Sequence, residues 1–122
     1  MDNWKTFVDK IKELLKSQNF RTAKEELKVG LEKLPNQLNL LTIATNVYRS
    51  SGDHEKSLRY AELLITHHPD KWHGYGHKAQ TLVILKRFEE AQATIQEGLE
   101  KLPNQFNLLT IATNVYLSLI HI

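Results

Sequence analysis

A long sequence segment occurs twice in the chain, and this repetition constrains the fold more than any other feature. Residues 30–50 read GLEKLPNQLNLLTIATNVYRS, and residues 98–118 read GLEKLPNQFNLLTIATNVYLS. The copies are offset by 68 residues, and Pro69 lies midway between Pro35 and Pro103. The underlying period is therefore 34 residues. Such a period is typical of a repeat array, in which each unit buries its apolar face against its neighbours.

Apolar residues recur at three- and four-residue spacing along the chain, which predicts α-helices and no β-strand. Prolines and short polar runs separate the helical segments, since proline cannot extend a helix. Asn3, Asn36 and Asp53 each precede a segment and are the expected N-caps. The predicted helices span about residues 4–17, 20–34, 37–50, 54–67, 71–84, 87–102 and 105–119.

Small residues recur where two helices of one unit must approach each other. Ala23, Ser57 and Ala91 occupy the same position near the start of the second helix of each unit. Gly74 and Gly76 fall within one turn of a predicted helix, although each glycine costs about 1 kcal/mol there relative to alanine. This pair indicates either close helix packing or open space above the backbone.

The period, the proline spacing and the small residues together resemble the tetratricopeptide repeat (TPR) family. The resemblance covers residues 4–118 and departs from the family at Ile11 and Leu64, where smaller residues are preferred. It implies an all-α fold, a right-handed superhelix of about seven antiparallel helices that forms one domain over residues 1–122. The implied repeats are about 4–37, 38–71 and 72–105, with a partial repeat at 106–118 and a divergent tail at 119–122.

The resemblance also implies a non-enzymatic protein–protein interaction scaffold whose concave groove binds a peptide or a helix. The first helix of each repeat would line this groove. Asparagine side chains recur on two of these helices, and carboxamides both donate to and accept from a peptide backbone. The candidate groove residues are Lys5, Val8, Lys12, Asn39, Thr42, Asn46, His73, Gly76, His77, Gln80, Asn107, Thr110 and Asn114.

One TPR subgroup holds the C-terminal carboxylate of heat-shock chaperones between lysine, asparagine and arginine side chains. Its clamp uses Lys and Asn in the first repeat, Asn in the second, and Lys and Arg in the third. The matching positions of this chain are Val8 and Lys12, Ile43, and His73 and His77. None of them matches, so this clamp is not expected to form.

Other functional classes find little support in the sequence. The chain has no cysteine, which excludes disulfides, thiol catalysis and Cys-ligated zinc. His73 and His77 are four residues apart, but no carboxylate completes a metal site, and no nucleophile lies in a glycine-rich turn. We therefore expect no enzyme activity, metal or cofactor. Structural or groove-lining histidines are the favoured interpretation.

Nucleic acid and membrane are also unexpected partners. A related helical-repeat family binds RNA with one base per repeat, but a net charge of +2 provides little attraction for a polyanion. No apolar run approaches the roughly 20 residues that span a bilayer. A cytoplasmic location is expected by default.

The end of the chain departs from the repeat. By alignment with residues 37–53, a Ser-Gly-Asp turn and a second helix should follow residue 118, but the chain reads Leu119-Ile120-His121-Ile122. A truncated array, an extraneous tail and a natural variant all fit this ending. One alternative function is therefore that of a recruitment or spacer segment within a larger TPR-containing protein or enzyme.

The last predicted helix lacks its usual partner, and its apolar residues cover more than one face. Large uncovered apolar surfaces normally mark interfaces. We therefore expect self-association into a homodimer or a higher oligomer. The candidate interface residues are Leu108, Leu109, Ile111, Ala112, Val115, Tyr116, Leu119 and Ile120.

Overall fold

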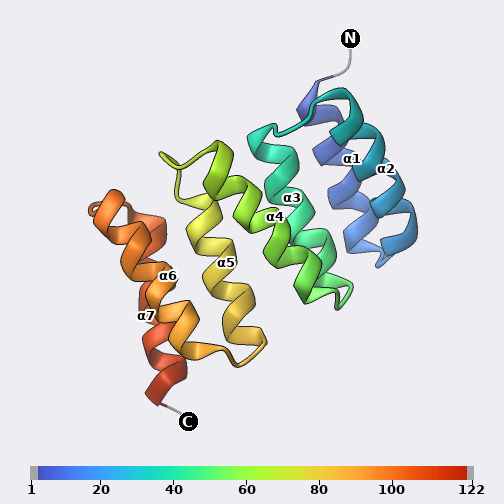
Figure 1. The fold of residues 1–122 in the computed structure, drawn as a ribbon. Helices are drawn as coiled ribbons and strands as arrows, with labels where there is room; N and C mark the ends of the chain where they lie inside the picture. Colours follow the sequence, from blue (N-terminus) through green and yellow to red (C-terminus); the bar gives the residue numbers. More distant parts are fainter. Residues whose placement is uncertain (1–2, 121–122) are drawn as a thin grey trace.

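The computed structural model describes residues 3–120, which form an array of seven α-helices without a β-strand (Figure 1). The helices are α1 (Trp4–Lys16), α2 (Phe20–Lys33), α3 (Leu38–Ser50), α4 (His54–His67), α5 (His73–Ile84), α6 (Phe88–Lys101) and α7 (Phe106–Ile120). The predicted all-α fold is confirmed, and each predicted boundary lies within two residues of the observed one. Leu119 and Ile120 continue α7, whereas residues 121 and 122 of the predicted tail lie outside the described residues.

The helices follow one another along the array, with α1 at one end and α7 at the other (Figure 1). The first helices of adjacent repeats contact each other: α1 with α3, α3 with α5, and α5 with α7. Within residues 3–120, the second helices α2, α4 and α6 do not contact one another. The repeats are therefore spaced more widely on the second-helix side, and α1, α3, α5 and α7 form the inner face. None of these seven helices has the length and apolar character needed to cross a bilayer.

The apolar interior consists of two clusters of buried residues, one in the first half of the array and one in the second. Between the two helices of each repeat, Ala23, Ser57 and Ala91 each have 0% exposed surface. A larger side chain at any of these positions would push the paired helices apart, because protein interiors are close-packed. The predicted role of the small residues is consistent with this burial.

Two of the three predicted N-caps are observed. Asn3 Oδ1 accepts a hydrogen bond from the Thr6 amide at 3.2 Å, and Asp53 caps α4 in the same way. The prediction for Asn36 is wrong. Asn36 adopts a left-handed conformation with φ of 63°, which asparagine tolerates, and it reverses the chain after Pro35. The cap of α3 is Gln37 instead, because its side-chain oxygen accepts from the Leu40 amide at 2.9 Å.

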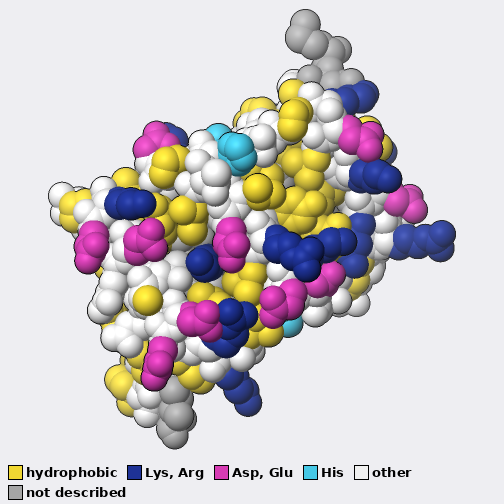
Figure 2. All heavy atoms as spheres, viewed as in Figure 1, with side chains coloured by type: hydrophobic (Ala, Val, Ile, Leu, Met, Phe, Trp, Pro, Cys, Tyr) yellow, Lys and Arg dark blue, Asp and Glu magenta, His cyan; other side chains and the backbone are white. Residues whose placement is uncertain are grey.

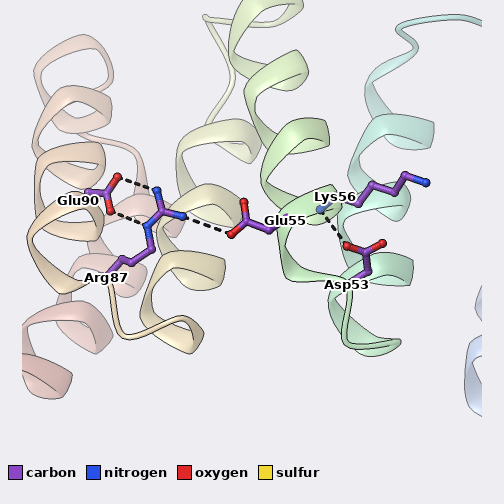
Figure 3. A network of polar contacts seen from close by, with 5 residues as sticks. All are labelled: Asp53, Glu55, Lys56, Arg87 and Glu90. Atoms are coloured by element: carbon purple, nitrogen blue, oxygen red, sulfur yellow. Dashed lines mark hydrogen bonds and ion pairs between the residues drawn. The ribbon is translucent and has the colours of Figure 1, made fainter.

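A small ion-pair network links the starts of α4 and α6 on the surface (Figure 3). Arg87 donates to both carboxylate oxygens of Glu90 within its own repeat, and its Nη1 lies 3.6 Å from Glu55 Oε1. These side chains are exposed, and solvent screening leaves such pairs with little stabilising effect. The network links two neighbouring repeats and contributes little to the stability of the fold.

Gly74 and Gly76 allow close packing of α5 against its neighbours. A Cβ atom at Gly74 would lie 2.7 Å from the backbone nitrogen of Ile65 in α4. A Cβ atom at Gly76 would lie 2.7 Å from Ile111 Cδ1 in α7. Of the two interpretations of this glycine pair, close helix packing is the correct one.

We expect Gly74→Ala to lower the free energy of unfolding by about 1–3 kcal/mol, the usual cost of overpacking. Alanine gains about 1 kcal/mol of helix propensity, but the backbone of α4 blocks the new methyl group. Gly30→Ala is the matched control, because the nearest atoms to its Cβ would be the side-chain atoms Phe7 Cγ at 3.1 Å and Leu40 Cδ2 at 3.3 Å and not a backbone atom. Urea denaturation measures both changes. Equal stability of wild type and Gly74→Ala would contradict the packing argument.

Candidate binding groove on the inner face

A hollow of ≈ 350 Å³ lies on the inner face between α3, α5 and α7. Helix α3 contributes Arg49, whereas α5 and α7 each present residues three or four positions apart, which share one helical face. Four of the lining side chains are aliphatic, three are uncharged polar groups, and one is an arginine. The lining residues are Arg49, Gln80, Val83, Ile84, Ile111, Asn114, Val115 and Ser118.

Arg49 extends from the last turn of α3 towards α5. Its Nη2 donates to Asn46 Oδ1 at 2.5 Å, and its Nη1 lies 3.4 Å from both Gln80 Oε1 and His77 Nδ1. All three partners are uncharged acceptors at neutral pH, and α3, α5 and α7 contain no aspartate or glutamate. Burial lowers the pKa of the Arg49 guanidinium. The groove thus holds a partly buried cation that has no carboxylate partner among the described residues.

His77 is only 8% exposed and lies beneath this guanidinium. Burial, followed by the charges of Arg49 and His73, lowers the pKa of His77 to about 3. The neutral ring accepts from Arg49 at Nδ1, which places its proton on Nε2. The Trp72 ring stacks on His73 and His77, with centroid distances of 4.3 and 5.7 Å.

Within residues 3–120, no cluster of three potential metal ligands occurs.

The predicted groove residues differ in how accessible they are. Val8 is 6% exposed and belongs to the first apolar cluster, so its prediction as a ligand contact is wrong. Gly76 and His77 are also buried, because they face the neighbouring first helix instead of solvent. The hydroxyls of Thr42 and Thr110 donate to carbonyls of their own helices. The accessible or partly accessible candidates are Lys5, Lys12, Asn39, Thr42, Asn46, His73, Gln80, Asn107, Thr110 and Asn114.

The sequence interpretation missed Arg49 and the aliphatic floor of the hollow. Arg49 and Val83 lie three residues after Asn46 and Gln80, so they continue the same helical face. Position 117 shares this register and is leucine, one of the two differences between the sequence copies. The helical spacing and this difference are the signals that could have identified Arg49.

A larger hollow of ≈ 510 Å³ opens on the other side of the array, lined by residues of α2, α3 and α4. Its lysines alternate with glutamates, and the ammonium groups of Lys24 and Lys56 lie 5.2 and 5.1 Å from the centroid of the Tyr48 ring. Figure 2 shows charged side chains of both signs intermingled on one face of the molecule. Lys28 and Glu32 of this hollow are exposed to solvent, whereas Arg49 is partly buried, so the inner groove is the stronger candidate site.

The predicted self-association residues of α7 separate into two groups. Leu108, Ile111, Ala112 and Val115 are at most 6% exposed and belong to the second apolar cluster, so they are not available to a second copy. Leu119 is partly buried. The residues that are exposed form what we call the outer face of α7. They are Phe106, Leu109, Tyr116, Leu117 and Ile120, of which Phe106 and Leu117 were not predicted.

The two sequence copies show what covers this face elsewhere in the chain. Leu41 in α3 is 1% exposed, whereas its counterpart Leu109 in α7 is 46% exposed. Tyr48 in α3 stacks on Tyr60 of α4 with a centroid distance of 5.5 Å. Within residues 3–120, α7 contacts only α5 and α6 and has no neighbour equivalent to α4.

Comparison with known proteins identifies the fold. No protein-family model matches the sequence. The crystal structure of the Sgt2 TPR domain from Aspergillus fumigatus superposes with a TM-score of 0.80 at 15% identity, covering 94% of this chain and 78% of that one. The first TPR domain of human RPAP3 gives 0.77 at 17% identity, covering 94% and 91%. The chain has the fold of a TPR domain.

A third TPR structure carries a ligand. The first TPR of Spaghetti (RPAP3), bound to the HSP90 peptide SRMEEVD, is similar to this chain with a TM-score of 0.75 at 17% identity, covering 94% of this chain and 91% of that one. At such identities the similarity establishes the architecture of the chain and not its partner. The predicted TPR resemblance is confirmed at this level.

The depressed pKa of His77 makes the stability of this TPR fold decrease in acid. The unfolded chain binds a proton at this residue below about pH 6.5, whereas the folded chain does so only near pH 3. The free energy of unfolding therefore decreases as the pH is lowered from about 6.5 towards 3. We expect His77→Gln, which keeps an acceptor for Arg49, to flatten this decrease in urea titrations. The exposed His67 provides a control, and an unchanged slope in His77→Gln would contradict the assignment.

Proposed function

We propose that this chain is a non-enzymatic protein-interaction module that binds a peptide segment of a partner protein along its inner face. The observation that carries the proposal is a pair of unoccupied amides on the inner face. The Asn114 side chain lines the hollow, whereas that of Asn39 lies at the start of α3, further along the same face. Neither amide has a hydrogen-bond partner among the described residues. The peptide complex of a TPR domain with the same fold supports this choice.

The chemistry of the inner face suits an extended peptide. Each asparagine amide offers two donors and one acceptor oxygen, which match the alternating groups of a peptide backbone. Val83 and Ile84 of the hollow offer an accessible aliphatic surface on which an apolar side chain loses contact with water. The polar groups would position the backbone, and the aliphatic surface would provide most of the affinity.

We expect Asn39→Ala/Asn114→Ala to weaken peptide binding about tenfold, because each net hydrogen bond contributes about 0.5–1.5 kcal/mol. Peptides are first selected by the wild-type protein from a displayed library of random dodecapeptides, and their affinities are then measured by fluorescence polarisation. The control is Gln92→Ala/Gln96→Ala on α6, where Gln92 is partly exposed and Gln96 is exposed. Failure of the wild type to enrich any peptide would contradict the proposed function.

We further propose that two copies associate through the outer face of α7. The five exposed side chains of this face would each contribute about 1.5–3 kcal/mol if fully buried. The helix contains no aspartate, glutamate, lysine or arginine. Two copies can therefore approach about a twofold axis without charge repulsion. A second α7 would cover Leu109 and Tyr116, whose counterparts in α3 lie beside α4.

We expect the wild-type chain to have the mass of a dimer by light scattering at micromolar concentration, and Leu117→Arg to shift it to a monomer. A charge placed in a buried apolar interface is costly. The near-identical helix α3 carries arginine at the equivalent position, Arg49, so the substitution is compatible with this helix. Val29→Arg, at an exposed apolar residue of α2, is the control. A wild-type mass of one chain would refute the self-association.

A further inference from the structure

The guanidinium of Arg49 is the one charged group among the residues that line the inner hollow. Its contacts are the side-chain oxygens of Asn46 and Gln80 and the Nδ1 atom of His77. Removing a cation from water is unfavourable unless a strong acceptor replaces the lost hydration. Neutral amides replace only part of it. The hollow therefore has an uncompensated positive charge beside an aliphatic surface.

We propose that Arg49 binds the carboxylate of an aspartate or glutamate side chain within the peptide, while a neighbouring aliphatic side chain of that peptide occupies the hollow. This inference rests on the proposed peptide-binding function and specifies its ligand. The accessible aliphatic part of the subsite is formed by Val83 and Ile84, and the buried Ile111 and Val115 lie at its floor.

The hydrogen bonds of Arg49 leave room for a carboxylate. Nη1 lies 3.4 Å from both Gln80 and His77, which is longer than the usual N–H···O distance of about 2.9–3.0 Å. A guanidinium has five N–H donors in a planar fork, and carboxylates accept from two of them at once. Charge-assisted bonds are about twice as strong as neutral ones, so a carboxylate would displace the weak contacts to Gln80 and His77.

Charge complementarity selects acidic over basic ligands. Helices α3, α5 and α7 carry no carboxylate that could attract a lysine or arginine of a partner. His77 stays uncharged beside Arg49 over the physiological range, because burial holds its pKa at about 3. The charge of the hollow is therefore that of Arg49, which repels basic side chains of a peptide. A single acidic side chain is enough to neutralise this charge.

The surroundings favour an internal side chain over a chain terminus as the source of this carboxylate. Accessible polar residues continue from the hollow along the inner face, to Asn39 at the start of α3 and to Asn107 at the start of α7. A peptide backbone that follows these residues therefore extends beyond the hollow. No second cation lines the hollow to neutralise an additional terminal carboxylate.

The repeat provides a conservative test substitution. Position 117 of the second sequence copy is leucine where the first copy has Arg49. Arg49→Leu therefore introduces a residue that this helix sequence already carries elsewhere. Arg49→Gln provides a second variant that removes the charge but keeps a polar side chain. Circular dichroism melting curves verify that both variants are folded.

The experiment selects random dodecapeptides displayed with constant flanking sequence at both ends, so that only side chains supply carboxylates. We expect the selected peptides to share an acidic residue adjacent to Val, Leu or Ile. Synthetic versions with blocked ends should bind Arg49→Leu and Arg49→Gln at least about tenfold more weakly than the wild type. Replacing the acidic residue of the peptide by its amide should weaken wild-type binding to the same extent. Lys28→Leu, on the exposed surface of α2, is the charge control.

Each outcome of the selection decides a specific claim. In a double-mutant cycle, the effect of the Glu→Gln change in the peptide should vanish in Arg49→Leu, and this measures the pair directly. Selected peptides without a shared acidic residue would overturn this inference and leave the proposed function standing. Enrichment only from a parallel library with free C-termini would overturn the side-chain assignment. Enrichment from neither library would overturn the proposed function itself, and the inference with it.

Discussion

Close contact between adjacent helices is the constraint on which the rest of this array depends. The backbone of α4 leaves no space for a Cβ atom at Gly74, and the fully buried Ala23, Ser57 and Ala91 allow the two helices of each repeat to approach closely. The small residues at positions 23, 57 and 91 recur every 34 residues, so this helix crossing recurs in each repeat. The first helices can then touch one another across repeats, which produces the inner face and brings Arg49 of α3 next to Gln80 of α5.

Much of this architecture could be predicted because repetition is a property of the sequence itself. The period, the seven helices and the small packing residues all follow from spacing. The errors concern features that depend on neighbours. Val8 is buried by contacts that no single-helix pattern shows, and the cap moved from Asn36 to Gln37 because the turn after Pro35 takes up one more residue. The hollow beside Arg49 requires three helices at once, so its volume and lining could not be read from one of them.

The two near-identical segments separate the contribution of sequence from that of surroundings. Both form the same helix with the same start, since Leu38 and Phe106 occupy equivalent first positions in α3 and α7. Their burial nevertheless differs, with Leu41 covered and Leu109 open. Local sequence therefore determines the helix, whereas the adjacent element determines whether a given apolar side chain belongs to a core or to a surface. This is why the predicted interface list mixed both kinds of residue.

The two proposed surfaces of α7 can operate together because they lie on different sides of one helix. Residues two positions apart are separated by about 200° around a helix axis, so Leu109 and Tyr116 point away from Ile111 and Ser118, which line the hollow. Leu117 lies at the edge of the outer face, because it follows Asn114, which lines the hollow, by three positions. A dimer centred on Leu109 and Tyr116 would therefore leave both hollows accessible. A partner with two suitable segments could then occupy both, and the second binding step would proceed at a raised effective concentration. A modest affinity of each hollow for one peptide segment would then be enough to hold such a two-segment partner stably.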